Sequence, residues 1–96
     1  MDTFTDIELE KSAFNAAERQ FLEGNTSAAL KLLEEYKQTY PEGAFSKVAT
    51  HYLAEIYFDK ERPEEALVAY QSLLEDPQVS TYSEKALTRV IILLKN

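Results

Sequence analysis

The strongest constraint on the fold is that the sequence repeats itself at an offset of 37 residues. Ala17-Glu18 recurs as Ala54-Glu55, and Ala29-Leu30 recurs as Ala66-Leu67. A fixed period of this size is typical of solenoid proteins, in which one supersecondary unit is stacked on the next. The chain is therefore predicted to be a short array of similar units.

The apolar residues within each unit recur at helical spacing. Between residues 45 and 57 they follow the i, i+3, i+4, i+7 pattern of one face of an amphipathic helix. Asn25 can cap a helix that starts near Thr26, and Pro63 suits a first helical position. Only two glycines and three prolines interrupt the 96 residues, which favours long helices. The sequence predicts five helices, over residues 5–23, 26–40, 44–60, 63–76 and 81–95.

At these positions the chain resembles the tetratricopeptide repeat (TPR), whose usual period is about 34 residues. The small residue of the family's first helix corresponds to Ala17 and Ala54, and the alanine that opens its second helix corresponds to Ala29 and Ala66. The resemblance implies an all-α fold, a right-handed α-α superhelix of antiparallel helix hairpins. About two TPR-like repeats would be followed by a fifth helix at the C-terminal end. The predicted organisation is a single TPR-like domain over residues 1–96, with repeat one at 5–40, repeat two at 44–77, and the first helix of a third repeat or a capping helix at 81–96.

Some positions depart from the family pattern. The signature tryptophan is absent, and Glu61 stands in the second unit where Gly24 closes the first helix of the first unit. Ile91 stands where the third unit should carry a small residue. Residues 33–41 and 54–58 look most like bacterial TPR proteins of the cell envelope, of the kind associated with outer-membrane assembly and the Tol-Pal system. The compartment stays open between the periplasm or cell envelope and the cytoplasm, since cysteine-free chains occur in both.

The family resemblance implies a protein–protein interaction scaffold. In this family the first helices of the repeats line a concave groove that holds a partner protein or peptide. Carried over by position, the predicted partner-binding residues of this face are Lys11, Phe14, Glu18, Leu22, Val48, His51, Glu55, Asp59, Lys85, Thr88 and Ile92. The mixture is acidic with apolar patches and would favour a partner with basic and hydrophobic residues. Two alternatives stay open: a merely solvated acidic face, or a structural, self-associating spacer within a larger cell-envelope protein.

Composition argues against several other classes of partner. The chain has 17 acidic and 10 basic residues and a formal net charge of −7, without a basic stripe that would bind nucleic acid. No stretch is long and apolar enough for direct membrane insertion. A chaperone C-terminal carboxylate would meet Glu18 and Glu55 where carboxylate-binding members of the family carry Lys, Arg and Asn. A protein or peptide partner without such a carboxylate therefore remains the expectation.

The sequence offers no constellation for catalysis. His51 is the only histidine, and Glu55 lies one helical turn further on, a spacing that is typical of a surface helix contact. With Asp59 the pair permits a weak metal site, but one histidine and two helical acids form a poor metal signature. Cysteine is absent, and so are phosphate-binding loops and nucleophile elbows. We therefore expect no enzyme activity, no cofactor, and neither a catalytic nor a metal site.

The last predicted helix is apolar around most of its circumference, at Val90-Ile91-Ile92-Leu93-Leu94. A terminal solenoid helix normally carries a polar outer face. The sequence therefore predicts that something covers this helix, either a continuation of the chain beyond Asn96 or a second copy in a homodimer. The first is the preferred expectation.

Overall fold

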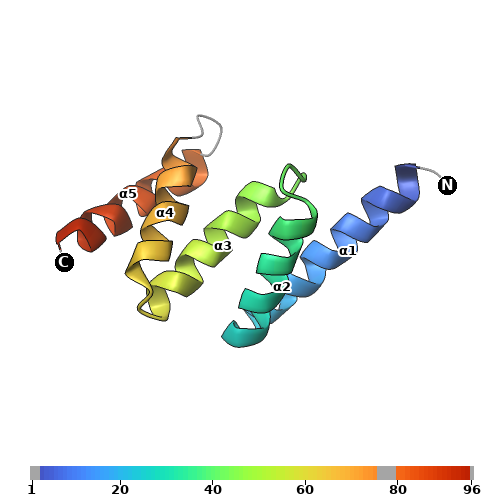
Figure 1. Cartoon of the computed structure of the whole chain (residues 1–96), viewed down its shortest axis with the longest axis horizontal. Coiled ribbons are helices and arrows are strands. Elements are labelled where there is room, and N and C mark those ends of the chain that lie inside the picture. Colours follow the sequence, from blue (N-terminus) through green and yellow to red (C-terminus); the bar gives the residue numbers. More distant parts are fainter. Residues whose placement is uncertain (1–2, 76–79, 96) are drawn as a thin grey trace. The chain divides into compact units, whose positions relative to one another are not determined.

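The computed structural model describes the backbone of residues 3–75 and 80–95 and the side chains of residues 6–75 and 88–95. This part of the chain is entirely helical and contains no strand (Figure 1). The helices are α1 (Thr3–Leu22), α2 (Thr26–Thr39), α3 (Ser46–Asp59), α4 (Pro63–Leu74) and α5 (Ser80–Lys95). The predicted all-α fold of five helices, packed in adjacent pairs, is thereby confirmed. The right-handed TPR-like stacking stays a prediction.

The chain divides into two compact units, residues 1–49 and residues 50–96. The division falls inside α3, so that the first turn of this helix belongs to the first unit and the remainder belongs to the second. Each unit has its own buried residues and its own hydrogen-bond network, and each is described by itself below.

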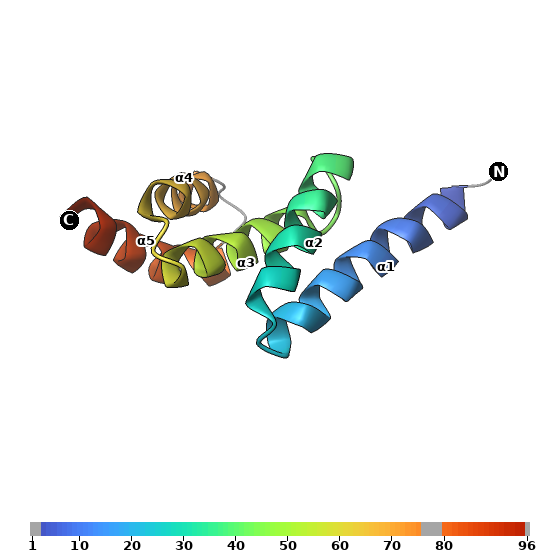
Figure 2. The ribbon, with the colours of Figure 1, turned by 60° about the horizontal axis from the view of Figure 1, so that its bottom comes forward.

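In the first unit, α1 and α2 pack side by side as an antiparallel hairpin (Figures 1 and 2). Ala17 and Ala29 are fully buried, and their small side chains allow the two helices to approach closely. Phe14, Leu33 and Tyr36 fill the space beside them. By the area removed from water, each of these large side chains stabilises the unit by about 1.5–3 kcal/mol.

In the second unit, the rest of α3 packs with α4 and α5 around one apolar cluster. Its buried members are Ala54, Ala66, Tyr70, Leu73 and Val90. Fully buried alanines again lie on the first and second helices of the hairpin, at the positions that the repeat offset predicts. In the predicted first helix of a third repeat, the side chains of residues 81–87 lie outside the described residues.

The turn between helices has the same backbone hydrogen bonds in both units. Asn25 N–H donates to the Gln20 carbonyl at 2.9 Å, and 37 residues later Arg62 N–H donates to the Tyr57 carbonyl at 2.8 Å. Such a bond closes a helix through a residue in the left-handed region. The repeat is therefore present in the local backbone as well as in the sequence.

The prediction that the Asn25 side chain caps α2 is wrong. Asn25 occupies the N-cap position, but its side chain makes no capping hydrogen bond. Its Nδ2 instead donates to Gln20 Oε1 at 2.8 Å, because the turn brings the amide over the preceding helix. Pro63, in contrast, opens α4 as predicted.

Candidate functional site

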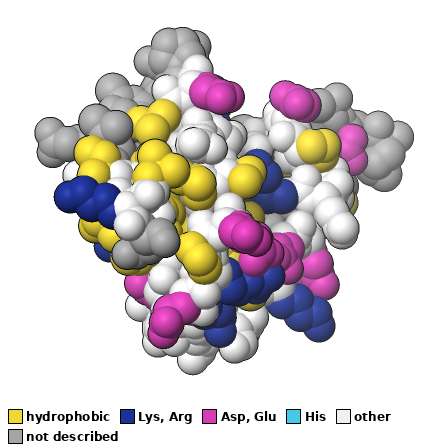
Figure 3. Space-filling view, turned by 60° about the vertical axis from the view of Figure 1, so that its left-hand side comes forward, with side chains coloured by type: hydrophobic (Ala, Val, Ile, Leu, Met, Phe, Trp, Pro, Cys, Tyr) yellow, Lys and Arg dark blue, Asp and Glu magenta, His cyan; other side chains and the backbone are white. Residues whose placement is uncertain are grey.

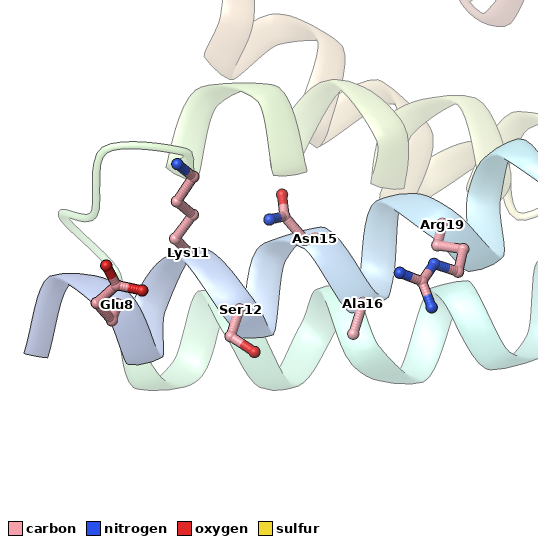
Figure 4. Close-up of a pocket in the computed structure, with 6 residues that line it drawn as sticks. All are labelled: Glu8, Lys11, Ser12, Asn15, Ala16 and Arg19. Carbon is pink, nitrogen blue, oxygen red and sulfur yellow. The ribbon is translucent and has the colours of Figure 1, made fainter. Parts of the chain in front are cut away.

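One side of α1 carries a hollow of about 440 Å³. Its lining residues are all exposed members of the same helix, and Figure 4 shows their side chains following one another along α1. They are Glu8, Lys11, Ser12, Asn15, Ala16 and Arg19. Phe14 and Ala17, which are buried in the hairpin, lie on another side of the helix. The packing of α1 on α2 therefore leaves this polar face uncovered within the first unit.

The predicted partner-binding residues of the first unit differ widely in exposure. Lys11 and Leu22 are exposed, and Glu18 and Val48 are half-buried. Phe14 is only 4% exposed, because its ring stacks on Phe45 at a centroid distance of 4.7 Å. Of the predicted residues, only Lys11 lines the hollow on α1. The structure thus gives Phe14 a role in the core, and its predicted partner contact stays a prediction.

In the second unit, Asp59, Thr88 and Ile92 are exposed and His51 is half-buried. The Lys85 side chain lies outside the described residues. Within this unit, Ile92 lines a second hollow, near the end of α3. Glu55 is only 8% exposed, and its carboxylate is used inside the unit. The combination of these residues with those of the first unit into one groove stays a prediction.

Glu55 is the centre of a buried polar cluster. The Tyr70 hydroxyl donates to Glu55 Oε2 at 2.5 Å, and Arg89 Nη2 lies 3.5 Å from Glu55 Oε1. The Arg89 guanidinium also covers the ring of Phe58, with its Cζ 4.0 Å from the ring centroid. A buried carboxylate with a hydrogen-bond donor and a cation is compensated rather than poised for chemistry. The cluster therefore joins α3, α4 and α5.

Sequence reasoning placed Glu55 beside His51 on a surface, and it did not find Tyr70 or Arg89 as its partners. No sequence signal distinguished Glu55 from Glu18, since both directly follow an alanine at equivalent positions of the repeat. The immediate neighbours of an acid on a helix do not indicate its partner, because they point to other faces of the helix. The identity of that partner depends on how α4 and α5 pack on α3.

A second network fixes the loop after α2, and it also escaped the sequence analysis. The Tyr36 hydroxyl donates to Glu10 Oε2 at 2.7 Å, and Ala44 N–H donates to the same oxygen at 2.8 Å. Phe45 N–H donates in turn to the Tyr36 hydroxyl at 3.0 Å. One carboxylate on α1 thus holds both α2 and the segment that leads into α3. These bonds satisfy backbone groups that the loop would otherwise leave unpaired.

These two tyrosines predict a loss of stability at alkaline pH. Burial and then the hydrogen bond to Glu10 raise the pKa of Tyr36 from 10.0 to about 12, and burial and then Glu55 raise the pKa of Tyr70. Because the folded pKa lies above the unfolded one, the stabilisation is complete below pH 10 and is lost as the pH rises through 12. We expect Tyr36 alone to lower the free energy of unfolding by about 1–3 kcal/mol over this range. Urea denaturation at several pH values should show a shallower fall for Tyr36→Phe, and parallel profiles would contradict the prediction.

Within the described residues, no group of three or more His, Cys, Asp or Glu side chains could hold a metal ion. In the same part of the chain, no helix combines the length and the apolar character that crossing a membrane requires. Comparison of the sequence and structure with protein-family models, curated proteins and solved structures gives no match. The site must therefore be interpreted from its own residues.

Proposed function

We propose that the chain is a protein–protein interaction scaffold of TPR type, which docks a partner protein or peptide on its helical hairpins. The observation that carries this proposal is the exposed, hollowed face of α1. The face is continuous over three turns of a helix whose opposite side is buried, and such an arrangement offers a rigid surface with fixed side-chain spacing. Its mixture of one acid, two bases and small polar residues suits a polar partner segment.

The two small residues of this face, Ser12 and Ala16, are the places where a partner can approach the helix most closely. Lys11 and Arg19 flank them and can pair with acidic groups of the partner. This part of the surface thus differs in charge from the acidic character predicted for the groove as a whole. We propose that the contacts with a partner in the first unit centre on these four residues.

Filling the hollow should weaken docking. Ala16→Tyr places a large ring where a partner would lie, whereas Ala28→Tyr adds the same ring to an exposed position on α2 outside the hollow. Both alanines are exposed, so both variants should fold. After capture of a partner from a native extract and reconstitution with purified protein, we expect Ala16→Tyr to weaken binding at least about tenfold, which corresponds to about 1.4 kcal/mol. Equal affinities of the two variants would remove α1 from the proposed site.

The alternative function, a self-associating structural module, is favoured by one observation. Ile91 and Leu94 on α5 are 49% and 65% exposed, which is unusual for neighbouring large apolar side chains. Figure 3, which brings forward the side on which α5 lies in Figure 1, shows hydrophobic side chains gathered there. Sedimentation equilibrium distinguishes the two functions, since a spacer that self-associates through α5 should dimerise and Leu94→Ser should abolish the dimer.

A further inference from the structure

A second hollow, of about 380 Å³, lies inside the second unit where three helix ends meet. Phe58 comes from the last turn of α3, Pro63 opens α4, and Ile92 and Leu93 come from the end of α5. These side chains form an apolar floor, of which Ile92 is 40% exposed. Among the described residues that line the hollow, Glu61 is the single charged one.

Glu61 has a backbone conformation that is unfavourable for any residue other than glycine. Its φ is +59°, in the left-handed region, whereas the equivalent turn of the first unit has Gly24 at φ +84°. The two turns share the same backbone hydrogen bonds, so the turn itself requires no side chain at this position. A residue with a Cβ is strained there, and glycine is not. Strain of this kind points to a role for the side chain outside the fold.

The charge beside the hollow is negative. The Arg62 guanidinium is paired with Glu65, because its Nε donates a hydrogen bond to Glu65 Oε1 at 2.7 Å. The other charged side chains of the α3–α4 turn, the first turn of α4 and the last turn of α5 are Asp59, Lys60, Glu61, Glu64 and Lys95. Acids outnumber bases among them by one, and Arg89, which covers the Phe58 ring, is paired with Glu55. Of the three helix ends, the C-terminal ends of α3 and α5 add partial negative charge and the N-terminal end of α4 adds partial positive charge. A cationic group is therefore favoured at the rim of an apolar floor.

We propose that this hollow docks a basic amphipathic helix of a partner protein. An aliphatic side chain of that helix would fill the space between Phe58 and Ile92, and a lysine or arginine one turn away would pair with Glu61. Anchoring by apolar side chains on one face is the usual way in which a helix binds to a helical surface. The inference rests on the proposed docking function and adds a second site with its own partner chemistry.

Glu61→Gly provides a test that separates binding from folding. Glycine relieves the positive φ and removes the carboxylate, so the melting temperature should stay equal or rise while binding weakens. The probe is a synthetic helical peptide with leucines at i, i+4 and i+7 and lysines beside them, titrated into the 15N-labelled full chain. We expect amide shifts to concentrate at residues 58–62 and 91–94, and Glu61→Gly to raise Kd about tenfold.

Matched controls make the result specific. Glu75→Gln alters an exposed acid of the same unit, at the C-terminal end of α4, that does not line the hollow, so it should change Kd less than about twofold. Ile92→Ser should weaken binding as strongly as Glu61→Gly, and the same peptide with glutamates in place of lysines should not bind. Glu61→Gln, which keeps the side-chain length, should weaken binding in the same way as Glu61→Gly.

Several outcomes would overturn the inference. Amide shifts confined to the face of α1 would remove this second site and leave the proposed function standing. A peptide that binds to neither site, together with a failure of Ala16→Tyr to affect partner capture, would count against both proposals. Equal binding of the acidic peptide, or an unchanged Kd in Glu61→Gly, would exclude the pairing with a cation. Self-association that Ile92→Ser abolishes would assign the hollow to a second copy of the chain.

Discussion

Replacing Gly43 by alanine is expected to destabilise the first unit by about 2–4 kcal/mol. An added Cβ would lie 2.6 Å from the Tyr36 hydroxyl and 2.9 Å from Tyr40 Cβ, and still closer to Glu10 Oε2. Two of these atoms belong to the network that fixes the loop, so the new methyl group would displace the bonds that satisfy Ala44 and Tyr36. The backbone at Gly43 is not in the left-handed region, so the effect should be steric alone.

A double-mutant cycle tests this cause. Glu10→Ala removes the nearest atom, so Gly43→Ala should cost distinctly less in that background than in the wild type. Gly24→Ala provides the contrasting control, because its φ is +84° and nothing lies within 4 Å of the added Cβ. Gly24→Ala should lower the free energy of unfolding by about 1–2 kcal/mol through backbone strain, and Glu10→Ala should not change this cost. Denaturant titrations measure all four differences, and an additive cycle would contradict the steric explanation.

Replacing Glu55 by alanine is expected to destabilise the second unit by about 2–4 kcal/mol. The Tyr70 hydroxyl would lose its acceptor although this residue is fully buried, and Arg89 would lose its carboxylate. Glu18, the residue 37 positions earlier, is half-buried, so Glu18→Ala should cost about 1 kcal/mol or less. Hydrogen exchange measured at each amide should show that Glu55→Ala lowers the protection of residues 50–74.

The free-energy cost of the unpaired Tyr70 hydroxyl can be separated from the cost of the lost packing. Tyr70→Phe removes the donor itself, so Glu55→Ala should cost less when Tyr70 is already phenylalanine. A loss in Glu55→Ala that is no larger than the loss in Glu18→Ala would show that the buried cluster contributes little.

The positions of the helices and the 37-residue period of the repeat follow from the sequence without the structure. Both ends of all five helices were predicted to within two residues, because helix formation depends on the local spacing of apolar residues and on turn residues such as Pro63. The shared turn geometry was not predicted, because Glu61 replaces Gly24 at this position, and the same hydrogen bonds in both turns became visible only in the structure. The small buried residues Ala17 and Ala54 also followed from the repeat alone.

The burial and the partners of the polar side chains, in contrast, depend on tertiary packing. Glu55 and Glu18 occupy equivalent positions in the repeat, yet Glu55 is buried against Tyr70 and Arg89 while Glu18 is half-buried. Likewise, Glu10 reaches Tyr36 only because the α1–α2 hairpin brings together residues that are 26 positions apart. Burial and pairing depend on which neighbouring element approaches, and helical periodicity contains no information about that neighbour. For this reason the repeat could predict the faces of the helices, whereas the buried acids and the two hollows became visible only in the packed structure.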